Sequence, residues 1–384
     1  MILPPSHSPA KHDHAMKAAR IEDRRGEIPM EQVSCLPFNE LLNLGSGFAT
    51  GQEIVQFYTS YGLLSVGGIL ISMFFFAWVG ATVMGIGYEN KDNPKAPGAY
   101  QTFCGKYLGT FYEYFVAFFL FCVVVVMISG AGATLNEYYG LNHLVGSAIM
   151  AIIVYIAYVF GLKGLVNVIG TIGPIIILFT MLVGIVTIFK NGSGLSEANE
   201  AINNMDIPQA SPKWWLSGLL YAAYNVFGSI IFLSELGKDA KSKKEAVIGG
   251  ATGGIVLMLG TLVMNIAFLS TIKETGTLAI PTLHLADNIS PIVGVIFSIV
   301  LILGIFSTAA PMTWTVCDRI VKEGTKKAKI VAAVVVLLAF IGGQLPFGTL
   351  VGIIYPYTGY LGILLFICLA GYKIKNFLNK KKEA

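Results

Sequence analysis

Two short segments, half a chain apart, combine glycine, hydroxyl and carboxylate groups inside apolar stretches. The first reads GSGFATGQE at 45–53 and the second reads GSIIFLSE at 228–235. Such groups are costly at bilayer depth unless they face a cavity lined by protein. Interrupted helices at corresponding places in two halves of a chain are typical of secondary transporters, where they form the binding site. The two segments therefore predict a transporter.

An opening of the first helix at 45–47 would leave backbone N–H groups without their usual acceptors. A half-helix starting near Phe48 would add the positive end of its dipole, so the opening is suited to a carboxylate. The carbonyl groups of Leu41 and Leu44, just before the opening, would be free to coordinate a cation. The second segment predicts the same chemistry at Gly228. Close crossing of two helices is the alternative interpretation of these glycines.

The composition indicates an integral membrane protein. Of the 384 residues, 55% are hydrophobic and 12% are charged, and the mean hydropathy is +0.70. Soluble domains carry about 25% charged residues. The net charge is only +4, with the basic residues in short loops, so we expect a lipid bilayer and a small-molecule solute as partners and no nucleic acid. The five cysteines show no metal-ligand spacing, and we expect no organic cofactor.

Ten stretches are candidates to span a bilayer, which takes about 20 apolar residues of helix. Nine are clear and lie at 62–87, 108–135, 143–161, 164–189, 214–236, 245–272, 290–316, 329–345 and 348–372. The tenth, 36–61, holds the first glycine-containing segment, and its leading half is poorly apolar. We therefore expect an all-α protein of about ten transmembrane helices, with helices one and six broken.

Basic residues set the expected orientation, because cytoplasmic loops are rich in lysine and arginine. With the N-terminus inside, only Lys190, Lys213 and Lys273 fall in outer loops, and the other basic residues after position 35 fall in inner loops or the C-terminal tail. We therefore expect a multi-pass protein of the cell (plasma) membrane with both termini in the cytoplasm. Two groups of five helices then enter the membrane with opposite topology, as in an inverted repeat.

The expected organisation has five parts. They are an N-terminal cytoplasmic tail at 1–35, a first five-helix repeat at 36–190, an extracellular loop at 191–213, a second repeat at 214–372 and a basic cytoplasmic tail at 373–384. The alternative for 1–35 is a non-native start, because this stretch runs directly into the weak half of the first span.

Span eight carries a second set of oxygen groups, at Ser307 and Thr308. Pro311 removes a hydrogen-bond donor and frees the Ser307 carbonyl group. Neutral oxygen ligands suit a hard cation such as Na⁺. The alternative interpretation is that the two hydroxyl groups bind no ion and donate hydrogen bonds to carbonyl groups of the preceding helical turn.

The run GSGFATGQEIVQFYTSYG at 45–62 resembles the first-helix signature of the YkvI-like family of bacterial membrane proteins. That family belongs to the amino acid–polyamine–organocation superfamily and has the LeuT-type fold. The resemblance covers about residues 44–372. It implies a five-plus-five inverted repeat with the site between spans one, three, six and eight.

The resemblance also implies a sodium site and a carboxylate site. The groups that would hold Na⁺ are the carbonyls of Leu41, Leu44 and Gly304 and the side chains of Ser307 and Thr308. A substrate carboxylate would meet the backbone amides of Ser46 and Gly47. Upstream of Leu44 the chain departs from the family pattern, because its half-helix is not smoothly apolar.

Several polar residues near the two segments are candidates to contact a substrate. The complete set of candidate substrate-binding residues is Gly45, Ser46, Gly47, Glu53, Tyr221, Asn225, Gly228 and Ser229. Tyr224 is placed as well as Tyr221, and no periodicity separates them. Glu53 would bind a substrate amine, relay a proton, or pair with lysine or backbone at the outer interface. Glu235 lies close to Lys238, and we expect a structural ion pair there.

These features predict a secondary active transporter of a small amino-acid-like or zwitterionic solute that works by alternating access. Sodium is the favoured coupling ion, and proton coupling through Glu53 is the alternative. A non-transporting, ligand-sensing membrane subunit is a further alternative, because subunits of spore-germination receptors resemble the same superfamily. The sequence contains no HExxH or GxSxG motif that would indicate an enzyme.

Overall fold

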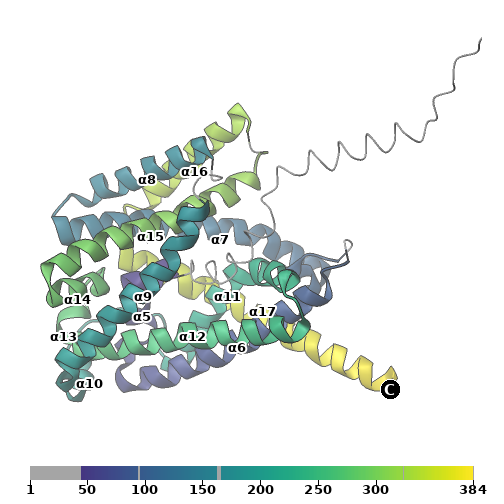
Figure 1. The fold of residues 1–384 in the computed structure, drawn as a ribbon, viewed down its shortest axis with the longest axis horizontal. Coiled ribbons are helices and arrows are strands. Elements are labelled where there is room, and N and C mark those ends of the chain that lie inside the picture. Colours follow the sequence, from purple (N-terminus) through teal and green to yellow (C-terminus); the bar gives the residue numbers. More distant parts are fainter. Residues whose placement is uncertain (1–44, 94–95, 162–165, 323, 384) are drawn as a thin grey trace, which may run out of the picture. The chain divides into compact units, whose positions relative to one another are not determined.

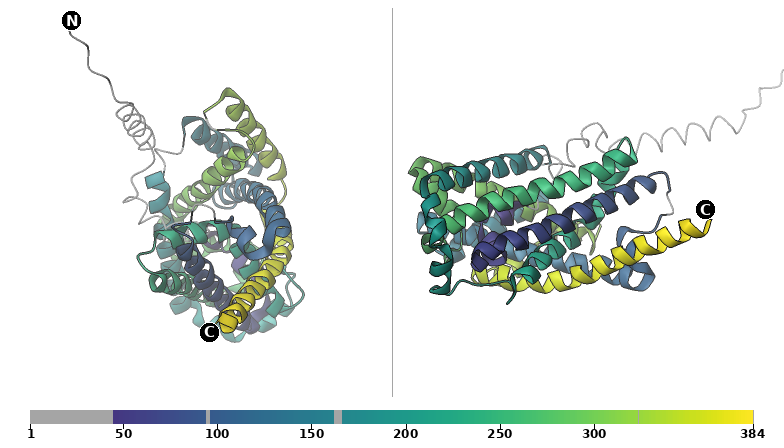
Figure 2. Two further views of the ribbon diagram at one scale, coloured as in Figure 1. Left: turned by 90° about the vertical axis from the view of Figure 1, so that its right-hand side faces the viewer. Right: turned by 90° about the horizontal axis from the view of Figure 1, so that it is seen from below.

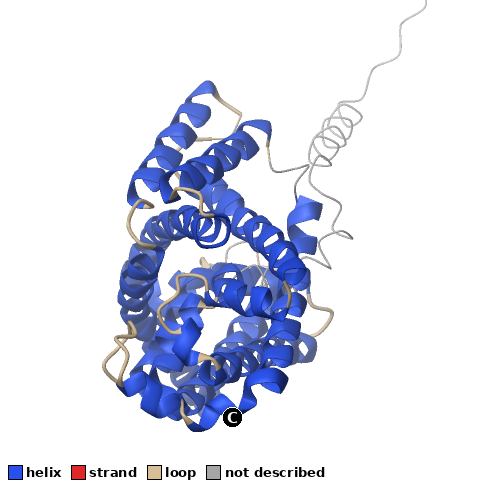
Figure 3. Ribbon diagram, turned by 90° about the vertical axis from the view of Figure 1, so that its left-hand side faces the viewer, coloured by secondary structure: helices blue, strands red, loops and turns tan. Residues whose placement is uncertain are grey.

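The computed structural model describes residues 45–93, 96–161, 166–322 and 324–383. Within these ranges all regular structure is helical and there is no strand, as Figure 3 shows. Eight of the described helices are long and apolar enough to cross a membrane. The predicted all-α membrane class is confirmed. The tail at 1–35 and the leading part of the first span lie outside the described residues.

The described residues of the first half form seven helical elements. They are α4 (Gly45–Thr50), α5 (Gln52–Phe57), the 3-10 helix η2 (Thr59–Leu64), α6 (Ser65–Glu89), α7 (Ala99–Tyr139), α8 (His143–Phe160) and α9 (Val166–Asn191). Helix α7 starts earlier than the expected span at 108, because a bend at Gly105 (φ 73°) adds a short N-terminal segment.

In the second half, the part of the chain that the structure describes forms five long helices and several short connecting ones. The long helices are α11 (Trp214–Asp239), α12 (Lys243–Ser270), α15 (Pro291–Asp318), α16 (Lys326–Gly342) and α17 (Phe347–Glu383). The short elements are η4 (Gly192–Ser196), α10 (Ala198–Asn203), α13 (Ile272–Thr275) and α14 (Pro281–Ile289). Helix α16 corresponds to the expected ninth span, and its 17 residues make it the shortest of the five.

Corresponding helices of the two halves pack against each other. Helix α6 packs on α12, α7 on α15, and α8 on α16. These are the second, third and fourth helices of each half. In Figure 1, α8, α15 and α16 lie toward the top and α6 and α12 toward the bottom. An inverted repeat brings equivalent helices together about a pseudo-two-fold axis, so this pairing agrees with the predicted five-plus-five arrangement.

Glycines let helix α6 lie very close to α11 and α12. A Cβ atom on Gly218 would lie 2.3 Å from the carbonyl oxygen of Gly68, and one on Gly80 would lie 2.3 Å from that of Gly250. Small residues allow such backbone approach in membranes, where dispersion contacts drive helix association. We call α5, α6, α11 and α12 the glycine-packed group. Helices α7, α8, α15 and α16 form the second group.

Two helices connect these groups. Helix α9 packs on both α12 and α15, and α17 packs on both α11 and α7. The right view in Figure 2 shows the C-terminal turns of α17 extending beyond the other helices. The space between the two groups is therefore bordered by α9 and α17.

The first helix is interrupted, at a place that differs from the expected one. Helix α4 already includes residues 45–47, and it ends at Thr50, just before Gly51, which has a φ of 83°. A second irregular stretch follows at 58–64, where Gly62 also has a positive φ. The expected opening at 45–47 coincides with the first described residues, so the part of it that precedes Gly45 lies outside them.

The expected break in helix six is wrong. Helix α11 runs without interruption through Gly228 and Ser229. The hydroxyl of Ser229 donates to the Asn225 carbonyl at 2.9 Å, which is a hydrogen bond within the same helix. A Cβ atom on Gly228 would lie 3.0 Å from the ring of Phe119. The glycine therefore allows close packing on α7, which was the alternative interpretation.

Candidate functional site

A small cavity lies between the glycine-packed group and the second group, where α5, α7, α11, α15 and α17 meet. Its described lining consists of Glu53, Phe119, Leu120, Val123, Met127, Tyr224, Asn225, Gly228, Thr308, Met312 and Tyr355. Its volume is about 40 Å³, whereas pockets for organic ligands usually measure roughly 300 Å³ or more. The cavity as it stands admits only a few water molecules, so a solute would bind after some of these side chains move apart.

Glu53 is the acidic residue of this cavity. Its side chain is 3% exposed. It is placed there by α5, whose first turn follows the bend at Gly51. The hydroxyl of Tyr224, from α11, donates a hydrogen bond to the carboxylate. The ring of Tyr224 stacks on that of Tyr355 from α17, with centroids 4.6 Å apart and an angle of 6° between the planes. Three helices thus position one carboxylate.

The structure separates the two tyrosines that the sequence could not distinguish. Tyr224 lines the cavity. Tyr221 is 2% exposed and lies in an aromatic cluster with Phe57 and Tyr58, at centroid distances of 5.4 and 5.0 Å. Tyr221 therefore supports the cavity wall instead of forming it.

The other predicted substrate contacts are distributed unevenly. Asn225 and Gly228 line the cavity together with Glu53, whereas Ser229 is bonded to its own helix. The backbone of 45–47 forms the first turn of α4. A carboxylate contact through those amides stays a prediction. The expected ion pair of Glu235 is confirmed, because Lys238 Nζ lies 2.6 Å from its carboxylate.

The oxygen groups of span eight come together on α15. Ser307 and Thr308 both donate to the Gly304 carbonyl oxygen, at 2.8 and 3.2 Å. Both hydroxyls therefore bond back to the preceding turn, which was the alternative interpretation. A hydroxyl that donates its proton keeps lone pairs for a cation, and the sodium site stays a prediction. Helix α4 packs on α15, which brings the first helix beside these groups. The two remaining predicted ligands, Leu41 and Leu44, lie outside the described residues.

The side chains of Glu137 and Gln52 hold the loop before α14 by hydrogen bonds to its backbone. We call this pair the clamp, and the sequence did not predict it. The carboxylate of Glu137, at the end of α7, accepts the backbone N–H groups of Ala279 and Ile280 at 2.7 and 2.9 Å. In the amide orientation that satisfies its neighbours, Gln52 donates to the carbonyls of Leu278 and Ala279 at 2.8 and 3.3 Å. The partners of Glu137 lie more than 140 positions away in the sequence, so no local pattern indicates this contact.

The same glutamine is connected to α17. Gln52 Oε1 accepts from Gln56 Nε2 at 2.7 Å, and Gln56 Nε2 also donates to the Gly348 carbonyl at 2.8 Å. The loop before α14, helix α5 and the start of α17 are therefore joined by one chain of hydrogen bonds next to Glu53.

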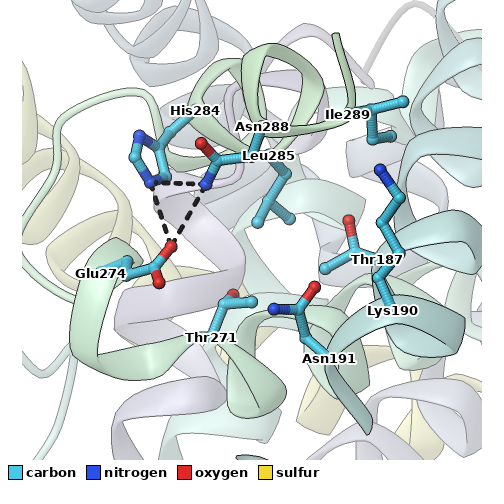
Figure 4. A pocket seen from close by; sticks show the side chains of 9 residues that line it. All are labelled: Thr187, Lys190, Asn191, Thr271, Glu274, His284, Leu285, Asn288 and Ile289. Atoms are coloured by element: carbon cyan, nitrogen blue, oxygen red, sulfur yellow. Dashed lines mark hydrogen bonds and ion pairs between the residues drawn. The ribbon is translucent and has the colours of Figure 1, made fainter.

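A larger pocket of about 590 Å³ lies at the ends of α9, α13 and α14 (Figure 4). Glu274, His284 and Asn288 form a hydrogen-bonded triangle on its wall, with distances of 3.0 to 3.4 Å. These side chains satisfy one another at a largely exposed position. We therefore take the smaller, buried cavity as the candidate functional site.

Two bacterial proteins have sequences similar to most of this chain. No protein-family model matches the chain. The chain is 28% identical over 323 residues to the uncharacterized membrane protein YkvI of Bacillus subtilis, covering 83% of this chain and 90% of YkvI. It is 22% identical over 331 residues to the uncharacterized protein YyaD of the same organism, covering 86% of this chain and 94% of YyaD.

Solved structures with a similar fold are transporters. MhsT in complex with L-phenylalanine superposes with a TM-score of 0.60 at 16% identity, covering 86% of this chain and 87% of MhsT. A manganese transporter of Eremococcus coleocola superposes with a TM-score of 0.57 at 11% identity, covering 89% of this chain and 80% of that one. At these identities the likeness concerns the fold. The relatives and the solved structures confirm the predicted resemblance: the chain is similar to the YkvI-like family of membrane proteins and has the LeuT-type fold.

Proposed function

We propose that this protein is a secondary active transporter, which moves a small amino-acid-like or zwitterionic solute across the cell membrane by alternating access. The observation that carries the proposal is the buried cavity that holds Glu53 between two separately packed groups of helices. In transporters built from inverted repeats, the solute binds near the middle of the membrane, where the two repeats meet.

The packing of the helices supports a mechanism in which the two groups move against each other. Close glycine contacts join α6 to α11 and α12, so the glycine-packed group moves as one body. The cavity lies at its boundary with α7 and α15. Rocking at this boundary opens the cavity first to one side of the membrane and then to the other. For the cavity to open on the side of α14, the hydrogen bonds from Gln52 and Glu137 to the loop before α14 have to break.

Sodium is the proposed coupling ion, with Gly304, Ser307 and Thr308 contributing ligands from α15. Thr308 also lines the cavity, so an ion there would lie beside the solute and strengthen its binding. Coupling to protons through the buried carboxylate of Glu53 is the second candidate. We place both termini in the cytoplasm, because the lysines at 190, 213 and 273 then lie outside and the other loop lysines inside.

Uptake by the full-length protein in proteoliposomes tests this function. Amino acids and related solutes are offered with an inward Na⁺ gradient, an inward H⁺ gradient, or neither. Accumulation that requires the Na⁺ gradient supports the proposal, and accumulation that requires only the H⁺ gradient supports the second candidate. Binding of solutes without any uptake would contradict transport and favour a ligand-sensing protein.

A further inference from the structure

Glu53 is the one acidic residue in the described lining of the cavity, and it has no positive partner among the described residues. Its carboxylate is 3% exposed and accepts one hydrogen bond, from the hydroxyl of Tyr224. No lysine, arginine or histidine belongs to the described lining of the cavity. The ion pairs of lysine in the described part of the chain involve Glu89, Glu197 and Glu235, all at exposed positions.

A buried carboxylate needs charge compensation, because it has lost its hydration shell. One hydrogen bond from a neutral hydroxyl compensates only part of that loss. The remaining compensation must come from something that enters the cavity. The available classes are a proton, a metal cation and the ammonium group of an organic molecule.

The walls around Glu53 favour an ammonium group over a metal ion. Phe119, Tyr224 and Tyr355 contribute aromatic rings to the lining, and Met127 and Met312 contribute flexible apolar side chains. A cation near the face of an aromatic ring is attracted by the ring's electron density, and amines and quaternary ammonium groups are recognised in this way. Hard metal cations instead require several oxygen ligands. Those proposed for sodium lie together on α15, at Gly304, Ser307 and Thr308, which leaves Glu53 for the ammonium group.

We propose that Glu53, held by Tyr224 and backed by Tyr355, is the subsite for a protonated amine, and that a cationic nitrogen is therefore required of every transported solute. This inference rests on the proposed transport function and specifies its substrate class. Tyr224 acts as a positioning residue: its hydroxyl donates to one carboxylate oxygen of Glu53, and the residue lines the cavity. The solute's carboxylate, where one is present, contributes less to selection than its amine.

The experiment compares solutes that differ by a single charged group. Three sets are used, each with an amino acid, its decarboxylated amine and its deaminated acid: alanine, ethylamine and propionate; leucine, isoamylamine and 4-methylpentanoate; phenylalanine, phenethylamine and 3-phenylpropanoate. Binding to the purified full-length protein is measured by thermal stabilisation and by competition with a labelled amino acid. We expect binding of amino acids and amines in at least one set, and no binding of the acids.

Glu53→Gln tests the residue directly, since the amide keeps an acceptor for Tyr224 and removes the charge. We expect a loss of affinity for amines of about ten- to hundredfold, the range of a hydrogen bond to a charged group. Glu235→Gln is the matched control, because it removes the charge of an exposed glutamate. A cooperative thermal unfolding transition like that of the wild-type protein shows that Glu53→Gln is folded.

The outcomes separate this inference from the proposed function. Binding of deaminated acids as tightly as of amines, or unchanged amine binding by Glu53→Gln, overturns the amine subsite while transport stands. Unchanged amine binding with loss of H⁺-driven uptake assigns Glu53 to proton transfer and also overturns it. If the wild-type protein binds and transports no solute of any set, the proposed function fails and the inference fails with it.

Discussion

Gln52 on α5 and Glu137 at the end of α7 hold the same short loop, residues 278–280, through hydrogen bonds of opposite polarity. Gln52 donates to the loop's carbonyl groups, and Glu137 accepts from its N–H groups. Gln52 is also the direct neighbour of Glu53, which faces the cavity. The position of the loop is thus linked to the position of the carboxylate, and we expect the loop to be released when the site opens.

The first prediction concerns this clamp. Glu137→Ala removes the acceptor of two backbone N–H groups, a change that costs about 1 kcal/mol at comparable helix caps. We expect the loop to be released more often and the cavity to open more readily toward α14. The measurement is the rate at which a membrane-impermeant thiol reagent labels the protein carrying Met312→Cys. A faster rate with Glu137→Ala is expected, and an equal rate would refute the clamp. Glu235→Gln is the control.

The second prediction concerns the bend between α4 and α5. Gly51 has a φ of 83°, and a Cβ atom there would lie 2.5 Å from both the ring of Phe268 and the hydroxyl of Thr282. Gly51→Ala therefore combines backbone strain with a clash, and we expect destabilisation of more than about 1 kcal/mol. Gly192→Ala is the control, because nothing lies within 4 Å of its Cβ position. Equal thermal midpoints for the two variants would contradict this account of the bend.

The third prediction concerns sodium. A ligand that binds only the folded protein stabilises it by about 2.7 kcal/mol at a hundredfold excess over its dissociation constant. We expect a higher thermal midpoint in Na⁺ than in K⁺ at equal ionic strength, and loss of this difference in Ser307→Ala with Thr308→Ala. Thr313→Ala is the matched control, since Thr313 lies on the same helix and donates to the Ala309 carbonyl at 2.8 Å. A difference that survives the double substitution would place the ion elsewhere.

The fourth prediction concerns an ion pair outside the membrane-spanning helices. Lys273 Nζ lies 2.5 Å from the carboxylate of Glu197. The hydrogen bond from Lys273 lowers the pKa of Glu197 below its ordinary value of 4.5, and the same bond raises the pKa of Lys273 above 10.5.

The sign of the pH dependence follows from these two shifts. The contribution of Glu197 is present above pH 4.5 and is lost as the pH falls through its lowered pKa; that of Lys273 is present below pH 10.5 and is lost above its raised pKa. Glu197→Gln should therefore lower the thermal midpoint slightly at pH 7 and leave it unchanged well below pH 4. Both side chains are exposed, so high salt should remove the difference. A difference that persists at low pH would exclude the ion pair as its cause.

Part of the candidate site was predictable because it depends on local chemistry. Glu53 stands out in the sequence as a carboxylate within an apolar stretch, and Gly304, Ser307 and Thr308 follow one another at helical spacing. The break at Gly228 was predicted wrongly, because a glycine before a serine has the same pattern whether it opens a helix or packs against a ring. Only the position of Phe119 on α7 decides between them.

The sequence by itself determined the membrane class, the approximate helices and the buried acid, because apolar run length and the cost of burying charge are properties of each segment alone. The tertiary structure alone decided that Tyr224 lines the cavity and Tyr221 supports it. The two tyrosines are three positions apart on one helix, so their roles depend on how α11 is rotated. Its close contacts with α6 at Gly218 and with α17 at Gly362 set that rotation.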